Sequence, residues 1–462
     1  MKNLISGWSN YKYFNCEIYK PENFFELKNF LKKNPKNKKI IARGHGCSNG
    51  DQSVLTDGTV VDINNLNKII DYDKENKKII VECGVKLSDI LSLTLKDDLF
   101  FKSIPGGLDI TVSGAISNNV HGKDCFKNGY FKENVNKIDL LLANGDLVET
   151  SMHENNELYN NLFSSLGLLG IIYSVELKLI DIKSPVLKTE TIVVENKNEM
   201  KKFFEESSEE SDYLIAWLDC AAKDSKCLRG ICRKAKFLEA EEISNYERKV
   251  YKKKINLQLE KRVSNNLRKN IFNLLWFIIG NTLGSKFFYL FNFLAFNFFK
   301  ILGKRKKNIL INEFTLIHEK YLPEYNNIFK SKGFVTIQPF FDNNNPFDKI
   351  ESVVRLCQSF KILPIWCPIK KYKKTNKNFF QFGDDGYSIV IEFSPHEIGI
   401  EKSKKFLSEL ENLIIEQNGK VYLAKDQIIS NKAAKKMYPE YKDFLKIKKK
   451  YDNQNLLCSE QF

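Results

Sequence analysis

Two glycine-rich segments have the residue types that bind phosphate groups. The first is RGHGCSNGD, Arg43–Asp51, which directly follows a short apolar run. The second begins at Pro105–Gly107, continues through TVSGA at Thr111–Ala115 and ends in NNVHG at Asn118–Gly122. Glycines lack Cβ and let backbone N–H groups approach a diphosphate, while Ser and Thr hydroxyls add donors. Two such loops facing each other could clamp a dinucleotide.

Neither segment has a known nucleotide fingerprint by itself. Gly44-x-Gly46 is followed by Gly50, one residue too late for GxGxxG, and no helix clearly begins there. The Lys-Ser/Thr pair of a P-loop is also missing. Either segment alone is explained equally well as a turn-rich loop, so the inference depends on both.

A histidine and a lysine could supply acid–base chemistry. His121 stands inside the second segment, and Lys425 lies in YLAKD near the end of the chain. Histidine titrates near neutrality, whereas a lysine does so only when burial or nearby cations lower its pKa. Residue type alone does not decide their roles, because the ordinary alternatives are a packed histidine and one exposed lysine among many.

Short apolar runs predict the elements that would position these residues. Strands are expected at 38–43, 59–63, 77–85 and 170–180, with an amphipathic helix near 87–95. Asn144-Gly145 is a strong hairpin signal between two further strands. The pattern predicts a strand-dense α+β domain with small βαβ-like pieces.

The composition changes at about residue 186. Residues 199–211 and 235–270 are charged and helix-prone, and residues 271–302 are apolar and rich in Phe. The apolar run is interrupted at 280–286 and ends in the basic GKRKKN of 303–308, so a single membrane span is not expected. It predicts either a buried helix pair or an interfacial hairpin that favours anionic headgroups, and we take 271–308 as a membrane-facing segment.

The remainder returns to mixed strands and helices. GFVTIQPFF at 333–341 and YSIVIEFS at 387–394 are predicted to be strands of one sheet. An amphipathic helix is expected at 401–419, ending at Gly419.

Overall composition bounds the class of protein. The chain has 462 residues, 43% hydrophobic, and a net charge of +15 that follows its general richness in lysine. No RNA-module or zinc-finger signature supports nucleic-acid binding. The 10 cysteines form no CxxC pair and have no matching histidine cluster, so neither a metal site nor a disulfide framework is expected. The first residues lack the apolar run of a signal peptide, which favours the cytoplasm or a membrane face.

Taken together, these segments resemble the vanillyl-alcohol oxidase/p-cresol methylhydroxylase (PCMH-type) flavoprotein superfamily. Similarity extends over nearly the whole chain and is closest to the decaprenylphosphoryl-ribose 2'-oxidases. It is carried by RGHGCSNGD, PGG, SGAISNNVHGKD, IDLLLANGD, AWLDC, NEFTLIHEKY, GFVTIQ and VYLAKDQ.

The resemblance implies an α+β fold with a two-lobed PCMH-type FAD-binding domain and an α+β cap (substrate) domain. Residues 1–185 would form the FAD-binding domain, 186–419 the cap, and 420–462 a tail that completes the FAD domain. The flavin would lie at their interface.

The resemblance also assigns residues to the site. Catalysis would involve His121 and Lys425. FAD would be bound by Ala42, Arg43, Gly44, His45, Gly46, Cys47, Ser48, Asn49, Gly50, Asp51, Gln52, Pro105, Gly106, Thr111, Val112, Ser113, Gly114, Asn118, His121, Gly122, Ile172 and Tyr422. Substrate would meet Lys123, Trp217, Gln338, Lys370 and Lys425.

This chain departs from its relatives at three points. Many of them attach FAD through a His just before the Ser of the first loop, where this chain has Cys47, so non-covalent FAD is expected. An Arg-Ser-Tyr run is replaced by Cys47-Ser48-Asn49, which removes the tyrosine. A cysteine near the substrate pocket of some members falls on Val390.

The resemblance implies FAD-dependent oxidation of a secondary alcohol, the 2'-hydroxyl of a polyprenylphosphoryl-ribose. A short-chain reductase partner would complete the epimerisation to arabinose for cell-envelope polysaccharide synthesis. One alternative is an aldonolactone or alditol oxidase acting on a soluble sugar, and another is a flavin-free scaffold of a membrane complex. The sequence leaves open which residue accepts the proton.

Overall fold

The computed structural model describes residues 2–33, 38–264, 266–315, 325–329, 332–365, 367–375 and 380–461. The N-terminal part begins with a four-stranded sheet of order β1-β2-β4-β3, formed by Lys2–Ser6, Tyr13–Tyr19, Thr59–Asp62 and Ile40–Arg43. Strands β3 and β4 are parallel, and both are largely buried because helix α1 (Phe24–Lys32) and the tail cover the sheet. The first glycine loop, residues 42–52, leaves the carboxyl end of β3.

A second, antiparallel sheet supports the other glycine loop. Its order is β5-β6-β10-β8-β9, formed by Ile69–Asp73, Lys78–Glu82, Ile171–Lys178, Val135–Leu141 and Leu147–Ser151. The hairpin signal at Asn144-Gly145 is confirmed, since Gly145 has φ +83° between β8 and β9. Helices of this part are α2 (Leu87–Thr94), α3 (Val112–Ser117), α4 (Cys125–Asn128) and α5 (Asn156–Leu162). Strands β7 (Leu99–Phe100) and β11 (Ile180–Asp181) pair with each other.

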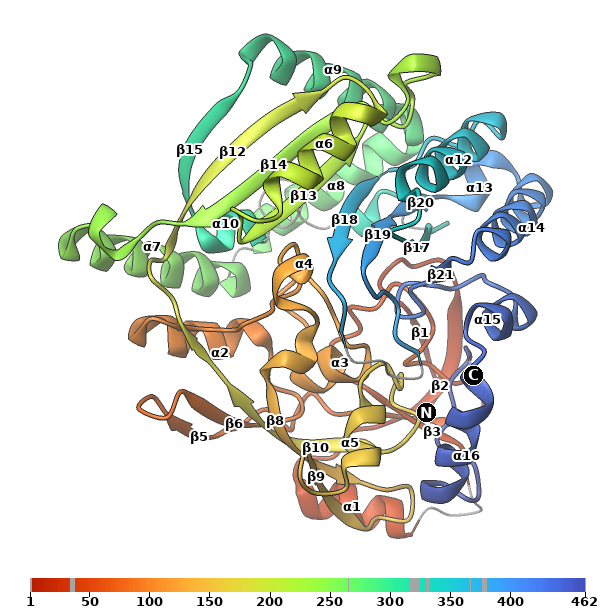
Figure 1. Cartoon of the computed structure of the whole chain (residues 1–462). Helices are drawn as coiled ribbons and strands as arrows, with labels where there is room; N and C mark the ends of the chain where they lie inside the picture. Colours follow the sequence, from red (N-terminus) through yellow and green to blue (C-terminus); the bar gives the residue numbers. More distant parts are fainter. Residues whose placement is uncertain are drawn as a thin grey trace.

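The C-terminal tail packs against the N-terminal part. Helices α15 (Asn431–Met437) and α16 (Tyr441–Tyr451) lie beside the first sheet in Figure 1. The chain then bridges back to β3, where Cys458 N donates to Ile40 O at 3.0 Å. The last residues therefore hold the strand from which the first glycine loop leaves.

The middle of the chain forms an eight-stranded sheet, which we call the cap sheet. Its order is β15-β12-β14-β13-β18-β19-β17-β21, formed by Arg305–Leu310, Val186–Val194, Gly230–Phe237, Tyr213–Leu218, Pro368–Tyr372, Gly386–Ile389, Pro339–Asp342 and Lys420–Val421. The domain boundaries remain a prediction, but β21 shows that the predicted tail begins with a strand of the cap sheet.

The two faces of the cap sheet have different surroundings. Alternation along the strands places Trp217, Lys370, Ser388 and Phe340 on one face, since the pairs are Trp217–Pro368, Lys370–Ser388 and Phe340–Ser388. Helix α9 (Ser285–Leu302) packs on this face. The opposite face is covered by α6 (Lys197–Ser207) and α12 (Pro346–Ser359), through Phe204 and Phe347 against Tyr387.

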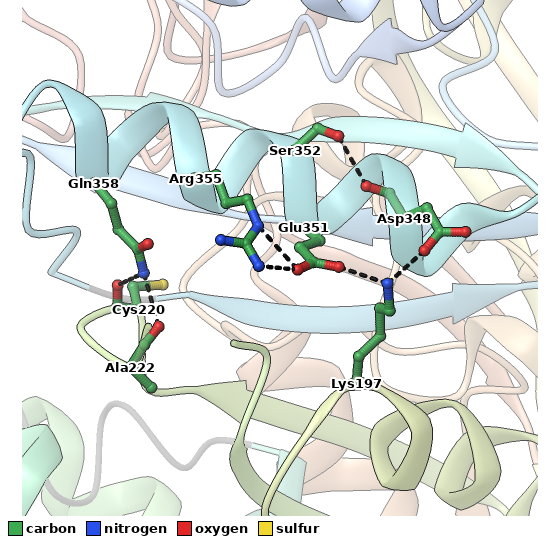
Figure 2. A network of polar contacts seen from close by, with 8 residues as sticks. All are labelled: Lys197, Cys220, Ala222, Asp348, Glu351, Ser352, Arg355 and Gln358. Carbon is green, nitrogen blue, oxygen red and sulfur yellow. Dashed lines mark hydrogen bonds and ion pairs between the residues drawn. The ribbon is translucent and has the colours of Figure 1, made fainter. Parts of the chain in front are cut away.

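An ion-pair network fixes α12 on that opposite face (Figure 2). Lys197 donates to Asp348 and Glu351 at 2.6 Å each, and Arg355 donates to Glu351 at 2.9 and 2.6 Å. Gln358 donates to the carbonyls of Cys220 and Ala222, which ties α12 to the loop after β13.

The helix-prone middle segment contains three long helices. These are α7 (Asn245–Ser264), α8 (Asn266–Thr282) and α9, with α10 (Ile311–Thr315) following β15. The helical hairpin expected at 271–302 is confirmed, and the chain turns at Gly284 with φ +54°. Part of the expected helix-prone region 235–270 is instead the end of β14. Residues 316–321 of the NEFTLIHEKY motif lie outside the described residues.

The expectation that 333–341 and 387–394 are strands of one sheet is confirmed for part of each run and wrong for the rest. Each run divides: β17 and β19 join the cap sheet, whereas β16 (Val335–Ile337) and β20 (Ile391–Phe393) form a separate pair. The breaks fall at Gln338 and Val390. Gln338 O accepts from Tyr422 N at 3.0 Å, so the returning tail takes the place of a regular strand partner there. The remaining helices are α13 (Pro395–Ile398) and α14 (Ile400–Glu416).

Candidate active site

The two glycine loops lie against each other. Cys47 Sγ is 3.5 Å from Asp109 O, and a Cβ added to Gly44 would collide with the Thr111 hydroxyl. Thr111 in turn caps α3 by accepting from Gly114 N at 3.3 Å, and Ser113 donates to Cys83 O at 3.0 Å. The predicted juxtaposition of 42–52 with the second glycine loop (105–122) is therefore observed.

The first glycine loop has unused backbone donors. Ser48 O accepts from Trp8 N at 2.8 Å, and Asn49 O accepts from Ser9 Oγ at 3.0 Å. Two carbonyls of the loop are therefore hydrogen-bonded to the segment that follows β1. Within the described residues, no acceptor is found for the N–H groups of Gly44, His45, Gly46, Ser48, Asn49 and Gly50. A row of free N–H groups after a buried strand fits a diphosphate.

Tyr422 joins three parts of the molecule. Its hydroxyl donates to Asn118 O at 2.8 Å and its N–H bonds Gln338 O, which links the second glycine loop to the cap sheet. Gln52 of the first loop donates to Leu423 O and, at 3.4 Å, to Asp426 O. The YLAKD segment is therefore fixed beside both loops, as predicted.

His121 is buried in an aromatic cage. Phe382 stacks on its ring at 5.6 Å, and the Tyr422, Tyr372 and Tyr130 rings lie 4.8, 5.2 and 5.7 Å away. Burial lowers the pKa of His121 well below its usual value, and the charges of Lys370 and Lys425 lower it further. The imidazole is therefore neutral at neutral pH.

Gln338 orients the imidazole. Its amide nitrogen lies 3.2 Å from His121 Nε2, 2.9 Å from the Tyr372 hydroxyl and 3.0 Å from the Ser388 hydroxyl. With this nitrogen donating to Nε2, the ring proton lies on Nδ1. Nδ1 is buried and has no partner among the described residues, so its N–H is available to a ligand.

Lys370 and Lys425 bring two ammonium groups to this site. Burial lowers the pKa of both, and the charge of Lys370 lowers the pKa of Lys425 further. Glu392, buried and bonded by Tyr325 and Thr336 at 3.3 Å each, acts in the opposite direction on Lys425. Burial raises the pKa of Glu392 to about 7, so this carboxyl is only partly ionised near neutral pH. It therefore balances the charge of Lys425 only in part. In the described part of the chain, no ion pair within 4.0 Å is formed by the Lys370 or Lys425 ammonium.

Three residues that were predicted to contact substrate or FAD are not among the side chains around His121. Lys123 donates to the carbonyls of Phe314 and Thr315 at 2.7 Å each, so its ammonium holds the end of α10. Trp217 lies 5.6 Å from the Phe291 ring and lines a cavity of about 10 Å³, which is too small for more than a water. Ile172 is buried in β10, paired with Leu140. Their predicted roles remain predictions.

Sequence reasoning missed several residues that lie around His121, Gln338 and Lys425. Tyr130, Tyr372, Phe382, Ser388 and Glu392 come from four separate stretches, and no local motif marks them. The strand alternation that aligns Lys370, Tyr372 and Ser388 was the one available signal. No group of three His, Cys, Asp or Glu side chains that could hold a metal ion occurs in the described ranges.

Comparisons with known proteins agree with this arrangement. Residues 18–151 match the FAD-binding domain family, and 347–462 match the D-arabinono-1,4-lactone oxidase family. Decaprenylphosphoryl-beta-D-ribose oxidase of Mycolicibacterium smegmatis is 24% identical over 428 residues, covering 91% of this chain and 88% of the relative. L-gulonolactone oxidase of Mus musculus is 29% identical over 180 residues, 38% of this chain and 40% of the relative.

The chain is an FAD-linked oxidase of the PCMH-type family. It is thus an FAD-dependent oxidoreductase acting on CH–OH groups, with an α+β FAD-binding domain and a cap. The residues present fit the cofactor, because the closely packed glycine loops and their free N–H groups suit the diphosphate.

Proposed function

We propose that this oxidase converts the 2'-hydroxyl of a polyprenylphosphoryl-ribose to the 2'-keto form. The observation that carries the proposal is the pair of ammonium groups, Lys370 and Lys425, placed beside neutral His121 without ion-pair partners in the described residues. Buried cations require a counter-charge, and an anionic substrate supplies it. The extent of similarity to the ribose oxidase, 88% of that relative, supports the same substrate class.

The proton of the substrate hydroxyl passes to Lys425 in its neutral amine form, which the lowered pKa of about 8 makes accessible. A base works best when its pKa is near the working pH, and burial together with Lys370 brings the pKa of Lys425 down toward neutrality. The pKa of His121 is lowered too far for an effective base. His121 instead donates through Nδ1–H to the substrate oxygen and fixes it near Lys425.

Oxidation removes two electrons and two protons in total from the alcohol. The C–H bond breaks with its electron pair as hydride, the O–H proton leaves to Lys425, and the carbon–oxygen double bond forms. When bound, FAD supplies the hydride acceptor. The aromatic cage of Tyr130, Tyr372, Phe382 and Tyr422 excludes water around the reacting oxygen.

The 2'-keto product requires a second step to become arabinose. A short-chain reductase that delivers hydride to the opposite face of the ketone would complete the epimerisation. We include this partner in the proposal, with cell-envelope polysaccharide synthesis as the context.

The test is reduction of the bound flavin under anaerobic conditions. The purified protein is mixed with farnesylphosphoryl-ribose, or with D-arabinono-1,4-lactone as the soluble alternative, and absorbance of the flavin is followed. Bleaching by the phosphoryl-ribose with formation of a ketone is expected. Bleaching by the lactone alone would overturn the proposal in favour of an aldonolactone oxidase, which the family match at 347–462 favours.

Cofactor attachment is tested on the same sample. Because Cys47 stands where relatives carry the linking histidine, acid precipitation should leave the flavin in the supernatant. Flavin in the pellet would contradict non-covalent binding. A protein purified without any flavin would support the scaffold alternative.

A further inference from the structure

Helix α9 is apolar on two opposite sides. The helix packs on β12 and β14, its buried residues are Phe288, Asn292 and Phe296, and the Arg229 guanidinium lies 4.3 Å from the Phe296 ring centre. Its outer side should be polar if it faced only water. It instead exposes Tyr289, Leu290, Phe293, Leu294, Phe298 and Ile301, of which Leu294 is 56% and Ile301 86% exposed.

Helix α8 continues the exposed surface. Its inner residues Trp276 and Ile279 form a small core with Phe288 of α9, while Leu274 and Phe277 are 61% and 53% exposed. More than half of the large apolar side chains that are exposed in the described residues fall within 271–302. A contiguous apolar surface of this kind marks an interaction site. We call the exposed outer sides of α8 and α9 the hairpin surface.

The shape of the hairpin favours lying on a membrane. Across the described residues, no one helix has the length and apolar character needed for crossing a bilayer, although 270–280 and 285–302 together have the composition. These two segments diverge by 104° at the turn, so they present a broad surface rather than a rod. A helix lying in the plane of the interface buries one side in lipid and keeps the other on the protein.

Charge specifies the kind of lipid. Residues 270–308 contain no Asp or Glu, and their charged residues are Lys286, Lys300, Lys304, Arg305, Lys306 and Lys307. Arg305–Lys307 are exposed on β15, the edge strand of the cap sheet that follows α9 directly. Cations beside an apolar surface complement anionic headgroups.

The hairpin surface and the active site share a face of the cap sheet. Trp217, on the same face as Lys370, contacts Phe291 of α9. Figure 1 shows α8 and α9 behind the strands, with α6 on the opposite side. Lys370 therefore lies on the same side of the cap sheet as the two helices that carry the hairpin surface.

We infer that the hairpin surface docks the protein on an anionic lipid bilayer. The apolar outer sides of α8 and α9 enter the headgroup–acyl boundary, and Arg305–Lys307 contact the phosphates. This inference stands on the exposed residues and their charge, and it deepens the proposed function by placing the enzyme where a lipid-linked sugar resides.

The test is sedimentation of the FAD-loaded full chain with vesicles. Vesicles of phosphatidylcholine are compared with vesicles that also contain phosphatidylglycerol. The native protein should sediment with the anionic vesicles. Replacing Leu290, Phe293 and Leu294 by Ser should lower partitioning by at least about tenfold, since three large apolar groups are lost.

Two further variants complete the design. Arg305→Gln with Lys306→Gln and Lys307→Gln should reduce binding to anionic vesicles only. Leu4→Ser with Phe25→Ser removes side chains that are 68% and 72% exposed but far along the chain from the hairpin, and should bind normally. Bound flavin reports that each variant is folded.

Equal sedimentation of the serine variant and the native protein would overturn the inference. So would a native dimer that fails to bind vesicles and becomes monomeric in the serine variant, because a second copy would then cover the surface. Vesicle binding without oxidation of phosphoryl-ribose would contradict the proposed function but still support docking on the bilayer.

Discussion

Two groups of charged side chains, one on each face of the cap sheet, show how differently lysine can be used. On the α12 face, the hydrogen bonds that Lys197 donates to Asp348 and Glu351 raise the pKa of its ammonium. On the other face, burial lowers the pKa values of Lys370 and Lys425. The carboxyls that act on them, Asp124 on Lys370 and Glu392 on Lys425, have pKa values that burial raises. The charge of Lys197 is balanced by carboxylates of the protein. The charges of Lys370 and Lys425 are balanced only in part, and an anionic ligand would supply the rest.

Lys425→Met tests this contrast most strongly. Loss of the proton acceptor should lower kcat by about a hundredfold to ten-thousandfold, with FAD still bound. Steady-state and single-turnover kinetics measure the change. Lys197→Met is the matched control and should leave kcat unchanged. Normal turnover in Lys425→Met would assign the proton to another group.

Gln338→Glu tests the tautomer of His121. A carboxylate accepts from Nε2–H, which moves the ring proton away from Nδ1 and removes the donor to the substrate oxygen. We expect kcat to fall about tenfold to a hundredfold with little change in KM. A pH profile of kcat separates this from a packing defect, since only the tautomer change alters its acidic side.

Lys370→Met should change both affinity and pH dependence. The rate rises with pH as Lys425 loses its proton, and this rise lies below pH 10.5, the usual lysine value. Removing the positive charge of Lys370 raises the pKa of Lys425, so the rise should move to higher pH.

Binding provides a second readout of the same variant. The KM for a phosphorylated sugar should increase about tenfold, the loss expected for one charged hydrogen bond. Lys371→Met is the control, because Lys371 donates to Ser208 on the α6 side of β18. A shift of the pH profile in the control as well would show a general electrostatic effect.

The sequence was informative where a local pattern or the family motif defined the structure. The glycine loops, the Asn144-Gly145 turn and the YLAKD segment were located in advance because each is continuous in sequence. The cage around His121 was not, because Tyr130, Tyr372 and Phe382 meet only after distant strands have paired. Likewise, the break at Gln338 depends on Tyr422, which is remote in sequence.

Lys123 shows a second reason for the limit. The family resemblance predicted substrate contact for Lys123, yet its ammonium donates to the carbonyls of Phe314 and Thr315 in α10. His121 and Lys123 are separated by Gly122 in a segment that turns directly into α4 and is not a regular strand, so their closeness in sequence does not fix where the two side chains point.

Glu351→Gln, on the α12 face, should have the smallest effect of these variants on activity and on the free energy of unfolding. It removes the shared partner of Lys197 and Arg355, but both cations are near the surface and Lys197 keeps Asp348. Ion pairs of this kind contribute about 0–1 kcal/mol to the free energy of unfolding. Denaturant unfolding should therefore show a loss within that range, with kcat and KM unchanged. A large fall in kcat would mean that the α12 face is coupled to the reaction, and the two faces of the cap sheet would no longer be separable.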